Sequence, residues 1–306
     1  MRSRRKSKRL SNSGERMSYV YIDGMFYEKE HAKISVFDHG FLYGDGVFEG
    51  IRAYNGTIFR LTEHVERLFD SAKVIALTPS VSKKEMEEII IKTCIKNSIR
   101  DGYIRPIISR GTGDLGLNPY LCKKTSIICI ADKISLYPKE DYENGLKIIT
   151  VATHRNYNES LNPRIKSLNY LNNIMAKIEA IQSGVKEALM LNPLGYVAEC
   201  TGDNLFIVRK GKIYTPSVQS GSLDGITAAA VAELAMKKGL EVISGLVSRF
   251  DIWTSDECWL TGTAAEMIPV ISLDARPIGD GKVGPIFKQL LADFKHLTET
   301  TGTPIA

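Results

Sequence analysis

Short runs of β-branched and aromatic residues dominate the N-terminal part of the chain, and polar turn residues separate them, as is typical of β-strands. The runs are VYI at 20–22, ISVF at 34–37, GVFEGIRAY at 46–54 and TIFRL at 57–61. Asn55-Gly56 separates the last two runs, and this dipeptide favours a two-residue hairpin turn. The pattern therefore predicts strands in these four segments and a hairpin at 55–56.

After these runs the apolar residues switch to a helical period. They recur at Val65, Leu68, Phe69, Ala72 and Ile75, and Thr62 precedes them as a candidate N-cap. Ser82 and Glu85 have the spacing of a capping box, which predicts a second helix that ends near Asn97. Strands are expected near 103–109 and 125–131. Together these elements predict a small N-terminal α+β domain over residues 17–132.

Residues 133–144 hold Pro138 and several charges without a clear period, so they are interpreted as an interdomain linker. Beyond them, strands are expected at 146–152, 187–191, 204–208, 241–243 and 257–261. Helices are expected from around Lys166 to Gly184, over 227–238, and from about Gly284. The pattern predicts a larger C-terminal domain over 145–306 and an α+β (mixed α/β) fold of two domains.

Charge is concentrated at the N-terminus. Residues 1–16 hold seven basic residues and one acidic residue, whereas the whole chain has a net charge of +5, so the remainder is nearly neutral. A basic arm could bind nucleic acid or an anionic membrane surface. We favour the simpler interpretation of a disordered basic leader, because well-patterned sequence begins immediately after Met17, and we expect no nucleic-acid or membrane partner.

Cysteine usage argues against two kinds of site. The five cysteines are odd in number, widely spaced and contain no C-x-x-C pair, which disfavours both a disulfide framework and a zinc site. We expect no metal site and a reducing, cytoplasmic location. No apolar run approaches the roughly 18 residues that a membrane-spanning helix needs.

A glycine-rich segment, Gly111-Thr-Gly113-Asp-Leu-Gly116, matches the spacing of dinucleotide-binding loops. That fingerprint requires a helix to begin at the glycines, so that its N-terminus meets the pyrophosphate. Here Leu117-Asn118-Pro119 continues as a loop. We therefore expect a glycine-shaped loop near an active site, and no nicotinamide or flavin site.

Five further segments carry candidate chemistry. They are Tyr43–Arg52 (YGDGVFEGIR), Pro163–Asn173 (PRIKSLNYLNN), Tyr196–Phe206 (YVAECTGDNLF) and the pair Gly225-Ile-Thr227 and Thr261–Glu266 (TGTAAE). In this order they resemble the class IV pyridoxal-phosphate aminotransferases, and specifically the branched-chain amino acid aminotransferases. The resemblance covers about residues 19–300. It implies fold type IV, the D-amino acid aminotransferase-like fold, with pyridoxal 5′-phosphate bound between the two domains.

The resemblance implies a role for three residues at the cofactor ring. Lys166 would form the Schiff base, because only a primary amine makes an imine with the cofactor aldehyde, and would then act as general acid and base. Glu199 would contact the pyridine nitrogen and keep it protonated. Tyr170 would face the ring hydroxyl oxygen, although the spacing from lysine to tyrosine varies in the family.

The cofactor phosphate is expected at a helix start, where free backbone N–H groups favour an anion. By the resemblance, the contacts come from Leu223, Gly225, Ile226, Thr227 and Thr263, and Arg67 adds a permanent positive charge. Periodicity alone places Arg67 on the solvent face of its helix. An outer helix face could nevertheless line a cleft between two domains.

The substrate pocket must accept an apolar side chain and then the charged side chain of glutamate. The resemblance assigns Tyr43, Phe48, Gly50 and Tyr103 to the pocket wall, and Arg105 to the glutamate side-chain carboxylate. Gly262, Thr263 and Ala264 would hold the substrate α-carboxylate. Tyr103 and Arg105 share one face of a strand, because they are alternate residues.

The implied activity is transfer of the amino group from L-leucine, L-isoleucine or L-valine to 2-oxoglutarate by a ping-pong mechanism, in a homodimer or a larger assembly of dimers. Other class IV enzymes remain alternatives, namely D-amino acid and amine transaminases and aminodeoxychorismate lyases. A basic-arm binder of nucleic acid or membranes is the alternative from a different class.

Overall fold

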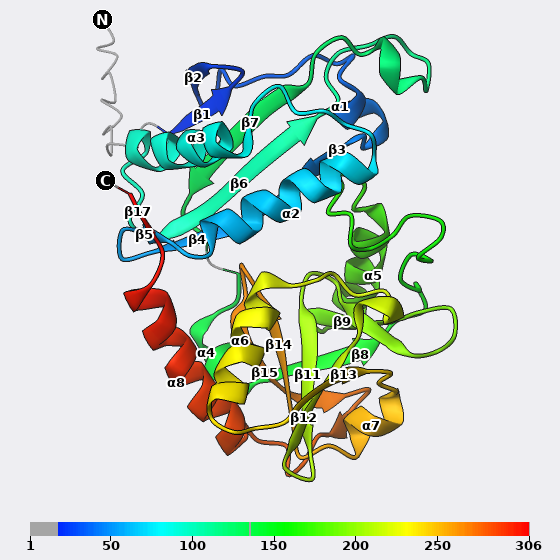
Figure 1. The fold of residues 1–306 in the computed structure, drawn as a ribbon. Helices are drawn as coiled ribbons and strands as arrows, with labels where there is room; N and C mark the ends of the chain where they lie inside the picture. Colours follow the sequence, from blue (N-terminus) through cyan, green and yellow to red (C-terminus); the bar gives the residue numbers. More distant parts are fainter. Residues whose placement is uncertain (1–17, 135, 306) are drawn as a thin grey trace, which may run out of the picture.

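The computed structural model describes residues 18–134 and 136–305, which form two β-sheets with helices packed against them (Figure 1). The predicted basic leader at 1–16 lies outside the described residues. Strands and helices alternate irregularly along the chain, as the mixed α/β prediction required. Among the described residues, no helix is long and apolar enough to cross a membrane.

The first sheet is antiparallel at every strand pair of the described residues, in the order β17-β5-β4-β6-β7-β1-β2, and β3 pairs with β6. Its strands are β1 (Tyr19–Ile22), β2 (Met25–Glu28), β3 (Gly46–Phe48), β4 (Ile51–Tyr54), β5 (Thr57–Ile58), β6 (Gly102–Ser109), β7 (Ser126–Asp132) and β17 (Thr303–Pro304). The predicted hairpin is confirmed, because β4 and β5 pair antiparallel and Asn55 and Gly56 both have positive φ angles, 48° and 84°.

The strand expected at 34–37 is wrong. These residues form no strand, and the side chains of Val36 and Phe37 are exposed. The segment instead leads to Asp38, whose carboxylate accepts hydrogen bonds from the backbone N–H groups of Gly40 and Phe41 and so caps helix α1 (His39–Tyr43). The apolar residues were misleading because no strand among residues 18–134 and 136–305 pairs with them.

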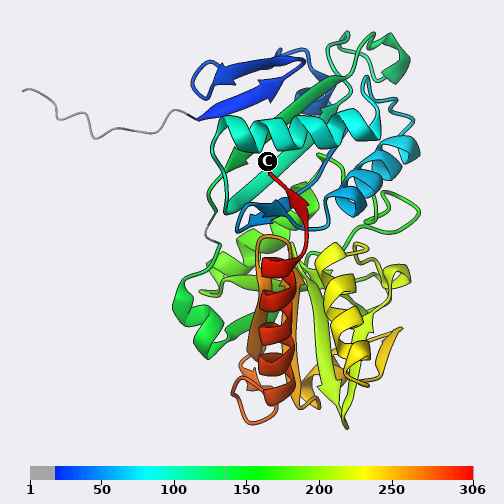
Figure 2. The ribbon, with the colours of Figure 1, turned by 60° about the vertical axis from the view of Figure 1, so that its left-hand side comes forward.

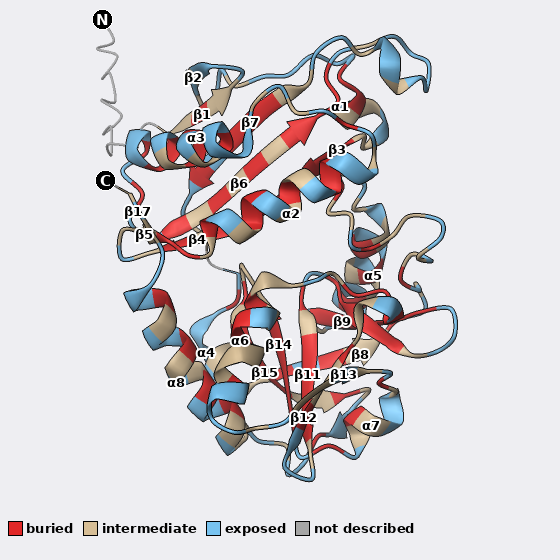
Figure 3. Ribbon diagram, viewed as in Figure 1, coloured by how far each residue is buried: buried red, intermediate tan, exposed pale blue. Residues whose placement is uncertain are grey.

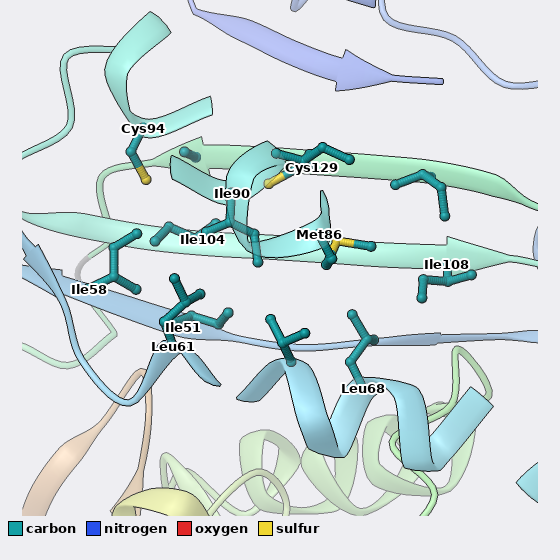
Figure 4. Close-up of a cluster of buried hydrophobic side chains, with 14 of the residues drawn as sticks. Ile51, Ile58, Leu61, Leu68, Met86, Ile90, Cys94, Ile104, Ile108 and Cys129 are labelled. Carbon is teal, nitrogen blue, oxygen red and sulfur yellow. The ribbon is translucent and has the colours of Figure 1, made fainter. Parts of the chain in front are cut away.

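Two longer helices cover one face of this sheet, α2 (Leu61–Val74) and α3 (Lys83–Lys96). The capping box of Ser82 and Glu85 is confirmed. The predicted cap at Thr62 is wrong, because the N-cap of α2 lies two residues earlier, at Arg60 in a left-handed conformation, and the Thr62 hydroxyl donates to Glu87. The buried core between helices and sheet includes Leu68, Met86 and Ile104 (Figure 4).

The second sheet has the order β10-β9-β8-β15-β14-β11-β12-β13, and β16 pairs with β15. Its strands are β8 (Leu146–Thr150), β9 (Glu187–Leu191), β10 (Val197–Cys200), β11 (Asn204–Arg209), β12 (Lys212–Pro216), β13 (Val242–Gly245), β14 (Glu257–Gly262), β15 (Glu266–Leu273) and β16 (Arg276–Pro277). The central strands β11 and β14 are almost wholly buried (Figure 3).

The helices associated with this sheet are α4 (Lys139–Asn144), α5 (Leu171–Gln182), α6 (Ile226–Lys237), α7 (Arg249–Trp253) and α8 (Pro285–Thr300), and short 3-10 turns lie at Pro119–Leu121 and Val218–Ser220. The helix expected to open around Lys166 begins later, at Leu171, so the lysine lies in a loop. Short-range backbone hydrogen bonds hold that loop, including one from Ser167 to Ile165 and one from Tyr170 to Leu168.

Two details bear on the predicted division at 133–144. The segment is not featureless, because it contains α4 and the buried side chain of Tyr137. The end of the chain also leaves the second sheet, because β17 pairs with β5 of the first sheet after α8 (Figure 2). We keep the boundary near 133–144 as a prediction, with the last residues returning to the N-terminal unit.

Candidate active site

Lys166 is held from the N-terminal domain although it belongs to the loop before α5. The backbone N–H of Phe48 donates to the Lys166 carbonyl at 2.9 Å, and the Lys166 N–H donates to the Ser71 hydroxyl at 3.2 Å. Its Nζ lies 3.2 Å from the Tyr170 hydroxyl and 4.9 Å from the centre of the Phe48 ring. The amine is therefore fixed where the two domains meet.

Glu199 lies on β10 and is 4% exposed. Its Oε1 accepts a hydrogen bond from Nε of Arg155 at 2.9 Å, and its Oε2 accepts one from the backbone N–H of Leu223 at 2.9 Å. Nδ2 of Asn204 lies 3.5 Å from Oε2 and also donates to the Leu223 carbonyl. The carboxylate is thus fixed by a cation and a backbone donor, and it lines the cavity that contains Lys166.

The start of α6 is built for an anion. Gly225 is its N-cap and offers no side-chain hydrogen bond, so the first backbone N–H groups, at Ile226 and Thr227, have no side-chain cap. A methyl group at Gly225 would lie 1.9 Å from Oδ1 of Asn204, which explains the need for glycine at this position. The predicted helix start at 225–227 is confirmed.

Arg67 lies between the two domains. Its guanidinium donates two hydrogen bonds to Glu49, at 2.7 and 2.9 Å, and one to the carbonyl of Asp224. Nδ1 of His64 lies 2.8 Å from the same carboxylate, which is fully buried. Although burial opposes its charge, Arg67 and His64 hold the pKa of Glu49 well below its usual range. The solvent-face position that periodicity gave Arg67 is wrong, because α2 turns this face toward α6.

The substrate side of the site combines aromatic rings with one arginine. The Arg105 guanidinium lies 4.6 Å from the centre of the Phe48 ring, and its Nη2 donates to the Tyr103 hydroxyl at 2.9 Å. Nε of Arg105 is buried without a hydrogen-bond partner among the described residues. A methyl group at Gly50 would lie 1.9 Å from the Tyr103 hydroxyl, so glycine is required there too.

The turn between β14 and β15, at Thr263 and Ala264, lines the same cavity as Lys166. Arg52, on β4 of the other sheet, donates to the Ala264 carbonyl at 3.2 Å and forms an ion pair with Glu266 at 3.1 Å. Glu266 has a positive φ of 60°, which is uncommon for a residue other than glycine. An arginine of the N-terminal domain therefore braces the Thr263-Ala264 turn from outside the cavity.

These groups line two adjoining cavities. The first holds the predicted cofactor residues together with Gly50, Tyr103, Gly262 and Ala264; they are Arg67, Lys166, Tyr170, Glu199, Leu223, Gly225, Ile226, Thr227 and Thr263. The second, of about 460 Å³, is lined by Phe48, Tyr103, Arg105, Lys166 and Ala264 among others. The structure therefore brings together every predicted site residue except one.

Tyr43 is that exception. It lies at the end of α1, is 39% exposed, and donates its hydroxyl to the Leu115 carbonyl at 2.6 Å. It lines neither of the two cavities. The segment at 111–116, which contains Leu115, is a loop as expected and not the start of a helix.

Several site residues were missed by the sequence reasoning. Glu49, Asp203 and Asn204 lie inside the motifs that carried the resemblance, and their proximity to identified residues was a usable signal. Arg155 and Tyr137 had no such signal, because the first follows a strand in an unremarkable loop and the second lies in the predicted linker. Only the fold brings them to Glu199 and to the second cavity.

The first cavity fits a phosphorylated, cationic ring. Its lining includes the start of α6 with its uncapped N–H groups, the Arg67 guanidinium, the Glu199 carboxylate and the Lys166 amine. The Thr261 hydroxyl, which also lines it, is buried without a partner among residues 18–134 and 136–305. Such an unsatisfied buried group is costly and is commonly found where a ligand completes the site.

Comparison with known proteins decides the family. The family model for class IV aminotransferases matches residues 46–273. The chain is 46% identical over 286 residues to a putative branched-chain-amino-acid aminotransferase of Methanocaldococcus jannaschii, covering 94% of this chain and 98% of that one. The chain belongs to the branched-chain aminotransferases of class IV. It is therefore a pyridoxal-phosphate-dependent transaminase of fold type IV, as predicted.

Solved structures agree with this assignment. The crystal structure of the Escherichia coli branched-chain aminotransferase superimposes with a TM-score of 0.90 at 35% identity, covering 93% of this chain and 96% of that one. The Thermobaculum terrenum enzyme was crystallised in its pyridoxal-phosphate holo-form (TM-score 0.86, 31% identity, covering 95% and 99%). The Thermoproteus uzoniensis enzyme was crystallised with norvaline (TM-score 0.88, 33% identity, covering 95% and 100%).

Proposed function

We propose that this aminotransferase moves the amino group of L-leucine, L-isoleucine or L-valine to 2-oxoglutarate in two half-reactions. The observation that supports it most is Arg105 among the rings of Phe48 and Tyr103, close to Lys166. The rings suit an aliphatic side chain, and the Arg105 guanidinium, which lines the same cavity, suits the side-chain carboxylate of glutamate. One cavity would then serve both substrates.

The residue roles follow from the geometry. Bound pyridoxal phosphate would supply an electron sink for the bond that breaks at the substrate α-carbon. Lys166 would hold the cofactor covalently and, once released, carry the proton at Nζ, with the Tyr170 hydroxyl 3.2 Å away. Glu199 would hold a proton on the ring nitrogen. The α6 start, Arg67 and Thr263 would bind the phosphate, and the Thr263-Ala264 turn would bind the substrate α-carboxylate.

We further propose that the active unit is at least a homodimer and that Tyr43 reaches the pocket of a second copy. Tyr43 is exposed and lines no cavity of its own chain. One face of α5 is also exposed and apolar, through Leu171, Ile174, Met175, Ile178 and Ile181. Gly44, beside Tyr43, packs against Asn169 just before that helix, so the two features adjoin. A second copy covering both would bury the apolar face.

A cytoplasmic location is also proposed. All five cysteines are free, and four of them are buried. Burial raises the pKa of Cys258 and Cys129, the latter to about 12, which keeps these thiols neutral. A reducing compartment suits such a set.

Two measurements test the proposed function. Lys166→Ala should abolish the visible absorption band of the purified protein mixed with pyridoxal 5′-phosphate, and full turnover with that band retained would contradict the lysine assignment. L-leucine and D-alanine should then be compared with 2-oxoglutarate as acceptor. Turnover of D-alanine with inert L-leucine would favour the D-amino acid branch.

The alternative of a basic-arm binder needs a separate test. Deletion of residues 1–16 should leave transaminase activity unchanged. Loss of a salt-sensitive interaction with nucleic acid or anionic vesicles on deletion would instead support that alternative.

A further inference from the structure

A second buried carboxyl group lies at the substrate cavity without an assigned task. Asp203, in the turn between β10 and β11, is 6% exposed and lines the cavity that contains Arg105. No hydrogen bond to its carboxyl is found within residues 18–134 and 136–305. Its Oδ1 stands over Gly262, so closely that a methyl group there would lie 2.0 Å from it. Asp203 thus contacts the residue that leads into the Thr263-Ala264 turn.

Glu187, on β9, is the contrasting neighbour. Its carboxylate accepts hydrogen bonds from the Tyr137 hydroxyl at 3.1 Å, from Nζ of Lys177 at 2.8 Å and from the Thr201 N–H at 2.9 Å. The fold therefore gives the donors to Glu187 and none to Asp203. Of two adjacent buried carboxyls, the one without donors is the one that keeps a proton.

The pKa of Asp203 follows this arrangement. Burial, and then the charge of Glu187, raise the pKa of Asp203 to about 7, against the opposing effects of Lys177 and Lys166. The group therefore changes charge near neutral pH.

Other charges around Asp203 do not mask this change. The remaining titratable groups that face it are Glu199 and Cys200 on β10, and Tyr137 and Tyr142 before β8. Glu199 is paired with Arg155. Burial raises the pKa of Cys200, Tyr137 and Tyr142, the last to about 12, so these groups stay neutral. Arg52 and Glu266, behind the turn, neutralise each other.

We propose that the protonation of Asp203 controls the binding of the substrate α-carboxylate at the Thr263-Ala264 turn. The neutral acid leaves the turn open to an anion. The ionised acid repels the anion across Gly262, and because Asp203 is buried its charge is only weakly screened by solvent. The proposal rests on the proposed function for the placement of the α-carboxylate. It makes Asp203 a positioning residue that acts through the electrostatics of the turn.

The size of the effect follows from linkage. A ligand that binds only when Asp203 is protonated loses about fivefold in affinity between pH 7 and pH 8, and changes little below pH 6. Asp203 acts on the α-carboxylate of the ligand. A ligand whose only carboxylate binds at this turn must therefore show the same loss of affinity between pH 7 and pH 8.

The test measures binding without turnover. 4-Methylvalerate has one carboxylate, an aliphatic chain and no amino group, so it occupies the site without reacting. Its dissociation constant is measured by calorimetry with the holoenzyme at pH 6, 7 and 8, for the wild type, for Asp203→Asn, and for Asp280→Asn as a control in an exposed loop. We expect the ratio of the two dissociation constants, wild type over Asp203→Asn, to rise about fivefold between pH 7 and pH 8. Asp280→Asn should behave as the wild type.

A constant ratio across the three pH values overturns the proposal, because a purely structural role of Asp203 would change affinity equally at each pH. Asp203→Ser, smaller and also neutral, must reproduce the pH-independent binding and serves where the asparagine variant does not fold. Absence of 4-methylvalerate binding to the wild type at every pH contradicts the proposed substrate class as well, which separates the two failures.

Discussion

Arg155 and Glu199 form a buried ion pair in which Nε and Oε1 lie 2.9 Å apart, with side chains only 5% and 6% exposed. The arginine is fixed in turn, because its Nη1 donates to Asn172 and Asn173 at 3.1 Å each. A short chain of contacts thus runs from the start of α5 to the carboxylate that is proposed to face the cofactor ring. Glu199 owes its orientation to a residue far from it in sequence.

We predict that Arg155→Met destabilises the protein by about 3–5 kcal/mol, because it leaves an uncompensated buried carboxylate. The double variant Arg155→Met/Glu199→Gln should recover part of this loss, since no buried charge remains. Urea unfolding of the wild type, the two single variants and the double variant gives the four free energies of unfolding that this comparison needs. A double variant no more stable than Arg155→Met would contradict the charge explanation.

The second prediction concerns Glu49, which fixes the guanidinium of Arg67 through two hydrogen bonds. Glu49→Gln keeps the shape but removes the charge, so Arg67 should lose its orientation toward the start of α6. We expect the dissociation constant of pyridoxal 5′-phosphate to rise about tenfold, the equivalent of one charge-assisted hydrogen bond. Absorbance titration of the apoenzyme measures it.

Glu66→Gln is the matched control, because Glu66 is exposed on the same helix. It should leave the cofactor affinity unchanged. An equal loss of cofactor affinity in both variants would mean that the total charge of α2 determines the affinity, and would contradict a specific role of Glu49.

Arg105 gives the third prediction. Arg105→Met should raise KM for 2-oxoglutarate by about 10- to 100-fold, because the side-chain carboxylate loses its charged donors. KM for L-leucine should change by less than about threefold, since the methionine still packs against Phe48. Steady-state kinetics with each substrate varied in turn checks both. The exposed Arg100→Met is the control, and equal rises for both substrates would contradict the assignment.

The exposed face of α5 gives the fourth prediction. Ile178 is 40% exposed in the middle of that face. Ile178→Glu should convert the proposed dimer to a monomer, because a charge would be buried in an apolar interface, and should lower activity by removing the partner's Tyr43. Light scattering gives the mass. Leu194→Glu, at a residue 76% exposed in the turn between β9 and β10, should remain a dimer. A dimeric, active Ile178→Glu enzyme would contradict this interface.

The sequence predicted those helices and turns correctly whose formation depends on residues close together in the chain. The capping box at Ser82 and the Asn55-Gly56 turn depend on neighbouring residues, and both are confirmed. The segment 34–37 failed as a strand because pairing is a property of the whole sheet. Lys166 failed as a helical residue because contacts with Phe48 and Ser71, far away in sequence, hold it in a loop.

The site residues fall into the same two groups, those that local sequence predicts and those that only the fold brings together. Residues inside the quoted motifs, such as Thr227 and Thr263, were reachable from the sequence. Arg155 and Tyr137, which lie outside these motifs, were not, because their importance comes from contacts with Glu199 and Glu187, about 40 to 50 residues away in sequence. Tyr43 shows a further limit, since its own chain gives it no place in the pocket.

Asp203 gives a prediction about stability as well as binding. In the unfolded chain an aspartic acid titrates at about 3.9, whereas in the folded protein the pKa of Asp203 is raised to about 7 by burial and Glu187. Between these values the folded state holds a proton that the unfolded state has lost, so this group's contribution to stability decreases as pH rises from 4 to 7. Above pH 7 Asp203 is ionised in both states, and the full destabilisation that comes from burying its charge is present.

Asp203→Asn should therefore be more stable than the wild type at pH 8, by on the order of 4 kcal/mol at most, and by only about 1 kcal/mol at pH 4.5. Urea unfolding of the holoenzyme at the two pH values, with Asp280→Asn as the exposed control, measures the difference. A stabilisation of the same size at both pH values would show that the asparagine improves packing. Stabilisation that is larger at the higher pH would show that a buried negative charge is removed, the same charge that is proposed to oppose the substrate carboxylate.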